Sequence, residues 1–144
     1  MRVIGLICLL ALLSAPLPAQ SPAAAKWGGF YDLSEISLEK SEPTLRLSLR
    51  LVNLGEEAVQ NATVSLTDTL HPYEIHGTFS AVALAAHASA DLSAVFQVPR
   101  MEAEHWQKGA APPLFIRYND AQGRAVKERI ALIRMALPFP GAKP

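Results

Sequence analysis

Residues 44–53 place the tightest constraint on the fold of this chain. They read TLRLSLRLVN, with leucines at Leu45, Leu47, Leu49 and Leu51 and mainly arginine or serine between them. Successive side chains of a β-strand point to opposite faces, whereas helical spacing would scatter these four leucines around a cylinder. Leucine favours helices, but the strict alternation is the stronger signal. It predicts a strand with one buried and one solvated face.

Related patterns along the chain predict further short strands separated by turn residues. The segments that we expect to be strands are 32–40, 44–53, 59–67, 78–84, 91–98, 113–120 and 124–135. Gly55, in the turn expected at 53–57, is free to adopt positive φ. The connection 100–111 is long enough for one helical turn at 101–106. These seven short strands predict an all-β fold, an antiparallel two-sheet sandwich.

One hydrophobic core should hold this sandwich together. We expect it to include Leu45, Leu47, Leu49, Leu51, Leu92, Phe96, Ile116 and Tyr118. Half of the residues are hydrophobic, so a sizeable core is feasible.

The last two predicted strands form a hairpin around residues 121–123 (AQG). A three-residue loop ending in glycine favours a type I turn followed by a left-handed glycine. The resulting register pairs Asp120 with Arg124, Tyr118 with Val126, Ile116 with Glu128 and Leu114 with Ile130. It points Glu128 inward, which is costly unless the carboxylate is paired. A shift by one residue would instead bury two cations.

The segment 130–137 (IALIRMAL) is apolar on both faces of a strand and therefore needs a cover. The nearest unassigned apolar groups are Trp27, Phe30 and Tyr31. Either this N-terminal segment or another protein covers the strand. We expect the N-terminal segment to do so, which predicts a monomer.

The first 19 residues are typical of a secretory signal peptide. Arg2 precedes an apolar run at 3–13, and two prolines and Ala19 follow it. A bilayer-spanning helix needs ~20 apolar residues, so the run is short for an anchor. A retained anchor remains the alternative. We expect cleavage after Ala19, a periplasmic or extracellular location, and no membrane contact after cleavage.

The chain is thus expected to have four parts: a signal peptide (1–19), a flexible N-terminal segment (20–31), a β-sandwich domain (32–136) and a disordered proline-rich tail (137–144).

Charge and cysteine content exclude several classes of function. Thirteen basic residues balance thirteen acidic ones, so a strongly basic nucleic-acid binder is excluded. The only cysteine, Cys8, lies in the expected signal peptide. The mature chain would therefore contain no disulfide, thiolate nucleophile or cysteine metal site.

Three stretches of the sequence resemble known modules. They are LRLSLRLVNLGEEAVQNATVSL (45–66), DLSAVFQVP (91–99) and IRYNDAQGRAVKERIAL (116–132). Together they resemble the immunoglobulin-like and fibronectin-III-like β-sandwich modules of bacterial exported proteins, including the cell-adhesion-related type. The resemblance implies a binding or spacing role and names no ligand.

Catalytic motifs are missing from the sequence. There is no glycine-rich phosphate loop, no His-Glu-x-x-His and no Gly-x-Ser-x-Gly. We therefore expect a non-catalytic protein without a cofactor.

Loop histidines are the candidate metal ligands. His71, His76 and His105, with Glu102 and Glu104, would bind a metal if their loops met at one end of the sandwich. Their spacing matches no standard zinc pattern, so we expect solvated loop residues and no metal.

The candidate binding surface is the outer face of the last hairpin. It comprises Phe115, Arg117, Lys127, Arg129 and Ile133. Aromatic, aliphatic and cationic groups on one sheet face suit an acidic or extended partner. The predicted function is therefore an exported, non-catalytic module for protein interaction or for envelope or extracellular assembly.

Two alternatives stay open. The first is a small carbohydrate-type binding module that uses Tyr73, Trp106 and Trp27. The second is a metal-binding protein or metal-dependent enzyme that uses the loop histidines.

Overall fold

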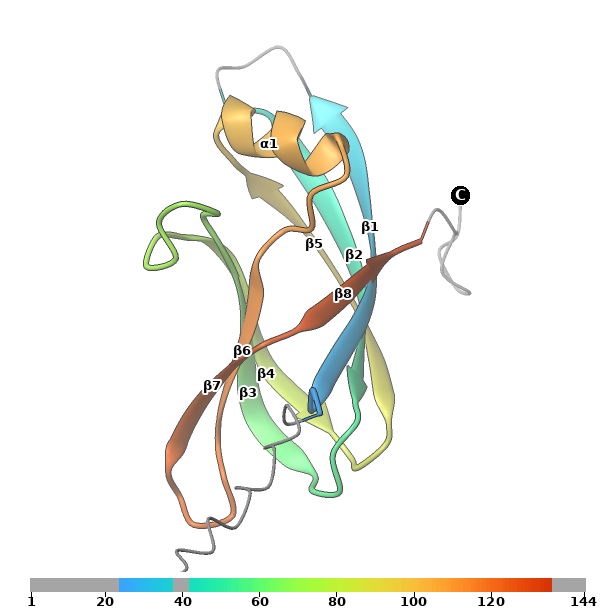
Figure 1. Ribbon diagram of the computed structural model, residues 1–144, viewed down its shortest axis with the longest axis vertical. Coiled ribbons are helices and arrows are strands. Elements are labelled where there is room, and N and C mark those ends of the chain that lie inside the picture. Colours follow the sequence, from blue (N-terminus) through green and yellow to red (C-terminus); the bar gives the residue numbers. More distant parts are fainter. Residues whose placement is uncertain (1–23, 38–41, 136–144) are drawn as a thin grey trace, which may run out of the picture.

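The computed structural model describes residues 24–37 and 42–135. This part of the chain forms two four-stranded sheets packed as a sandwich, with one short helix at one end (Figure 1). The elements are β1 (Trp27–Ser37), β2 (Thr44–Asn53), β3 (Val59–Thr67), β4 (Ile75–Leu84), β5 (Ser89–Gln97), α1 (Arg100–Gln107), β6 (Leu114–Asn119), β7 (Ala125–Arg129) and β8 (Ala131–Arg134). The predicted all-β two-sheet sandwich is confirmed, with eight strands in the described residues instead of about seven.

The strand order is β5-β2-β1-β8 in one sheet and β4-β3-β6-β7 in the other. All neighbouring strands are antiparallel except β1 and β8, which are parallel. The expectation of a purely antiparallel sandwich is therefore wrong at this pair. The cause is a split in the last predicted strand. β7 completes one sheet, and after Ile130 the chain crosses to the other sheet and runs alongside β1 (Figure 1).

The alternating leucines of β2 lie at the centre of the core, as predicted. All four are at most 2% exposed, because β2 is paired on both sides and its inner face meets the second sheet. Leu49 lies opposite Tyr31 of β1 and Leu92 of β5. Six of the eight predicted core residues belong to the buried core cluster, and Leu92 and Tyr118 are partly buried and pack against it.

β1 begins at Trp27, so the prediction of a flexible segment up to residue 31 is wrong for 27–31. Trp27, Gly29 and Tyr31 face inward and are buried. Gly29 has no side chain because the core leaves no room for one: a Cβ there would lie 2.8 Å from Leu49 Cδ1. Because Gly29 occupies an inward position, the alternation of apolar and polar residues that would predict this strand is interrupted.

The final hairpin has the predicted register. Asp120 N–H donates to the Arg124 carbonyl at 2.9 Å, and Gly123 has φ of +77°. Ile116 lies opposite Glu128. The inward Glu128 carboxylate is paired, because Trp27 Nε1 and Tyr118 Oη each donate to its Oε2 at 2.9 Å.

The turn after β2 is held by Asn53 rather than by glycine flexibility. Gly55 does not adopt the positive φ that is open to a glycine. The buried Asn53 side chain instead accepts the Gly55 N–H at 3.0 Å and donates to the carbonyls of Glu57 and Ala85. The expected signal peptide and the tail at 137–144 lie outside the described residues.

Candidate functional site

Four of the five predicted surface residues gather on the outward face of β6 and β7. Phe115 lies opposite Arg129, and Arg117 lies opposite Lys127. We call these four residues the cationic face. The Lys127 Nζ lies 4.8 Å from the centre of the Phe115 ring. Within residues 24–37 and 42–135, the structure forms no ion pair to Arg117, Lys127 or Arg129.

Ile133, the fifth predicted residue, belongs elsewhere. It lies on β8 in the other sheet, where it is exposed and pairs with Phe30. The prediction treated 124–135 as one continuous strand, but the crossing at Ile130 moves the last part of it to the other sheet.

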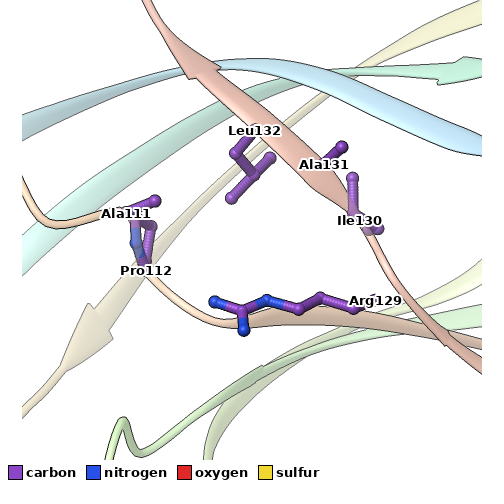
Figure 2. A pocket seen from close by; sticks show the side chains of 6 residues that line it. All are labelled: Ala111, Pro112, Arg129, Ile130, Ala131 and Leu132. Carbon is purple, nitrogen blue, oxygen red and sulfur yellow. The ribbon is translucent and has the colours of Figure 1, made fainter. Parts of the chain in front are cut away.

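A hollow of about 300 Å³ adjoins the cationic face (Figure 2). It lies between the connection at Ala111 and Pro112 and the segment in which the last strand crosses between the sheets. Its lining consists of Ala111, Pro112, Arg129, Ile130, Ala131 and Leu132. Arg129 is the only charged residue among them, and its side chain extends toward Pro112 in Figure 2. The hollow therefore combines apolar walls with one cation that also belongs to the cationic face.

In the part of the chain that the structure describes, β8 is the edge strand of its sheet. Met135 N–H donates to the Tyr31 carbonyl at 2.8 Å, on the side of β1. Backbone groups of successive strand residues point to opposite sides, so those of Leu132 and Arg134 point to the free edge. Leu132 also lines the hollow. An extended chain could therefore reach both unpaired backbone groups and the apolar lining.

The predicted histidine cluster is reorganised around Asp68, in the loop between β3 and β4. Asp68 Oδ1 accepts the N–H groups of Leu70 and His71 at 2.9 and 2.8 Å. His71 Nδ1 lies 3.3 Å from Asp68 Oδ1, and His76 Nε2 lies 3.5 Å from Asp68 Oδ2. The ligand atoms of Asp68, His71 and Glu74 all lie within 4.8 Å of one another.

The environments of these side chains differ. Burial raises the pKa of Asp68, but the backbone amides of His71 and Leu70 and the His71 side chain outweigh it and lower the pKa below its ordinary value. Asp68 is therefore ionised at neutral pH. The His71 side chain is 67% exposed, as expected for a loop residue. The expectation of solvation is wrong for His76, which is only 11% exposed and has a buried, unpartnered Nε2.

The helix α1 holds this loop in place. The buried carboxylate of Glu102 accepts Thr69 N–H at 3.1 Å and Thr69 Oγ1–H at 2.7 Å. Trp106 Nε1 lies 3.3 Å from Thr69 Oγ1, and the Trp106 ring lies 6.3 Å from that of His76. Glu102 is thus engaged in anchoring the loop.

The other two candidate metal ligands on α1 lie apart from the group formed by Asp68, His71 and Glu74. Glu104 and His105 are exposed on α1 and contribute no ligand atom to the group found in the described residues. Sequence reasoning missed Asp68 and Glu74. The local spacing Asp-x-x-His-x-x-Glu-x-His, from Asp68 to His76, was the signal that could have found them.

Only one of the three aromatic residues considered for carbohydrate binding is accessible. Tyr73 is 92% exposed, whereas Trp27 and Trp106 are buried in the core. A sugar platform made of all three is therefore excluded.

No protein-family model matches the chain, and no curated protein matches it significantly. A structure from the Northeast Structural Genomics Consortium is similar, with a TM-score of 0.46, 11% identity and coverage of 83% of this chain and 95% of that one. A GH20 exo-β-N-acetylglucosaminidase from Vibrio harveyi gives a TM-score of 0.45 at 13% identity, over 83% of this chain and 20% of that chain. This chain thus spans about a fifth of that enzyme. Likenesses at this level assign neither a family nor an activity.

The described residues contain no helix that is both long and apolar enough to span a membrane.

Proposed function

We propose that this protein is an exported, non-catalytic β-sandwich module that binds an extended, acidic segment of another protein. The observation that carries the proposal is the cationic face, with three cations and Phe115 on neighbouring strands. Unpaired cations on a sheet face attract acidic partners, and the aliphatic stems and the aromatic ring add apolar contact. The protein would act in the envelope or outside the cell.

The hollow and the edge of β8 extend this surface. Arg129 belongs to both the cationic face and the hollow, so one bound chain can contact both. An apolar side chain would enter the hollow, and a neighbouring carboxylate would pair with Arg129. The free backbone groups of β8 suit an added strand, a common mode of peptide recognition.

Binding is tested with a fluorescent peptide of alternating glutamate and valine. We expect affinity that falls with salt, because the attraction between exposed charges is screened. The double variant Arg117→Ser/Lys127→Ser should bind at least ten-fold more weakly. The matched control is Arg46→Ser, which changes an exposed arginine on the other sheet. Equal binding by the wild type and the double variant would overturn the proposed surface.

Export is tested separately by mass spectrometry of the protein recovered from the periplasm or medium. Cleavage after Ala19 leaves Gln20 as the first residue. Recovery of only the uncleaved chain in the cell would contradict export without bearing on the peptide assay.

A further inference from the structure

The loop between β3 and β4 and the start of β4 carry four side chains that can bind metal. Asp68 immediately follows β3, His71 lies in the loop, Glu74 immediately precedes β4, and His76 is the second residue of β4. The ligand atoms of Asp68, His71 and Glu74 lie within 4.8 Å of one another, and His76 approaches this group through Asp68. The two histidine–carboxylate separations are 3.3 and 3.5 Å. Two ligand atoms on one tetrahedral ion, each about 2.0 Å from it, lie about 3.3 Å apart. The spacing of each pair is therefore that of neighbouring ligands.

One side of this group is buried and has unused hydrogen-bonding capacity. Asp68 Oδ1 holds two backbone amides, whereas Oδ2 accepts no hydrogen bond from the described residues. His76 Nε2, 3.5 Å from Oδ2, is buried and has no hydrogen-bond partner. A buried polar atom such as His76 Nε2 is rarely left unpaired. A cation between the two side chains would engage both His76 Nε2 and Asp68 Oδ2.

The loop is held rigidly enough to keep these atoms in place. Asp68 N–H donates to the Glu74 carbonyl at 2.9 Å, and Glu74 N–H donates to the His71 carbonyl at 2.8 Å. The Glu102–Thr69 contacts tie the loop to α1. The side chains of His71 and Glu74 are exposed, so they can rotate to complete the coordination of an ion bound at Asp68 and His76.

We propose that Asp68, His71, Glu74 and His76 form a binding site for a divalent transition-metal cation such as Zn²⁺. Two imidazoles favour Zn²⁺ and related metals, because Ca²⁺ and Mg²⁺ take oxygen ligands. Two carboxylates balance the charge of the ion. The site uses none of the residues of the cationic face, so it is independent of the proposed function.

The first experiment measures Zn²⁺ binding to untagged protein by isothermal titration calorimetry. The variant His71→Asn should bind Zn²⁺ at least ten-fold more weakly, and so should Glu74→Gln. Both change exposed side chains, so they should fold. The matched control is His87→Asn: His87 is 58% exposed and lies 3.0 Å from Glu56, an exposed carboxylate elsewhere in the molecule. His87→Asn should bind as the wild type does.

The second experiment follows the ring nitrogens of all four histidines by ¹⁵N nuclear magnetic resonance during Zn²⁺ titration. The ring nitrogens of His71 and His76 should shift to metal-bound values, while those of His87 and His105 stay in place. Unchanged His71 and His76 rings would overturn the site. So would an equal loss of affinity in His87→Asn and His71→Asn.

Discussion

At the scale of single residues, adjacent residues of one strand differ in burial because their side chains point to opposite faces of the sheet. Leu49 is fully buried, whereas the next residue, Arg50, points outward and pairs with Asp91 at 2.7 Å. Glu128 and Lys127 form a second such pair of neighbours. Glu128 turns inward to Trp27 and Tyr118, and Lys127 lies over Phe115. The energetic cost of a substitution should therefore follow the face on which the residue lies.

Leu49→Ala should lower the free energy of unfolding by about 2–5 kcal/mol, because it leaves a cavity between the sheets. Arg50→Ala changes an exposed side chain and should cost much less, because an exposed ion pair contributes little to stability. Urea denaturation followed by tryptophan fluorescence measures both. Equal losses would mean that the inner and outer faces of β2 are reversed.

Glu128→Ala should cost about 1–3 kcal/mol, because it removes the acceptor for both Trp27 Nε1 and Tyr118 Oη. Glu128→Gln keeps an acceptor oxygen and should cost less. The control Glu104→Ala, at an exposed position of α1, should change stability by no more than about 0.5 kcal/mol. If Glu128→Ala behaves like this control, the buried hydrogen bonds contribute nothing to stability.

At the scale of the elements, the turn of the last hairpin and the two glycines of β1 can each be tested by substitution. Asp120 organises the last hairpin: its Oδ1 accepts the N–H groups of Gln122 and Arg124, and its Oδ2 accepts Arg124 Nε–H at 2.8 Å. In β1, Gly28 and Gly29 are adjacent, but only Gly29 faces the core. The turn predicts a stability that depends on pH, and the glycines predict that only one of two adjacent substitutions lowers stability.

The turn should make stability depend on pH in the acid range. The backbone N–H of Arg124, followed by its guanidinium, lowers the pKa of Asp120 below the ordinary value of about 3.9. A lowered pKa in the folded state adds stability above the pKa of the unfolded chain, and this stability is lost as pH falls through the folded pKa. Asp120→Asn should therefore be less stable than wild type at pH 7, and the difference should shrink as pH falls below the ordinary carboxyl pKa. Melting temperatures measured from pH 7 into the acid range test this, and a constant difference would contradict it.

Gly29→Ala should cost about 1–3 kcal/mol, because the new Cβ would lie 2.8 Å from Leu49 Cδ1 and 3.0 Å from Leu132 Cδ2. Gly28→Ala meets nothing closer than 3.4 Å and should change stability by no more than about 0.5 kcal/mol. Chemical denaturation of the two variants makes the comparison. Similar losses at both glycines would show that β1 does not pack against the core as described.

At the scale of the whole molecule, the N-terminal strand closes the fold. β1 pairs with β8 and contributes Trp27 and Tyr31 to the core. The predicted contact between the N-terminal segment and the final strand is therefore confirmed, as strand pairing rather than as a cover over one face. The monomeric state remains a prediction.

Deleting residues 20–31 should expose β8 and cause self-association, because β8 would lose β1, its one neighbouring strand among the described residues. Size-exclusion chromatography at several concentrations measures this. Deletion of residues 20–25 is the control, since it leaves Trp27 and the whole of β1. A protein without residues 20–31 that stays monomeric and equally stable would overturn this role of β1.

The sequence by itself determined the features that depend on local periodicity and turn chemistry. The alternating leucines specified β2 and its buried face, and the glycine turn at Gly123 specified the register of the last hairpin, including the inward Glu128. Both follow from the pleat of a strand and the backbone freedom of glycine, which involve only nearby residues.

Contacts between residues far apart in the chain were decided only by the tertiary structure. Trp27 reaches Glu128 across 101 positions, and the crossing at Ile130 places Ile133 on the other sheet, away from the cationic face. Likewise, α1 and the β3–β4 loop bury His76 beside Asp68, while His105 stays apart. Periodicity states which face of a strand is buried, but packing between the sheets decides which residues meet there.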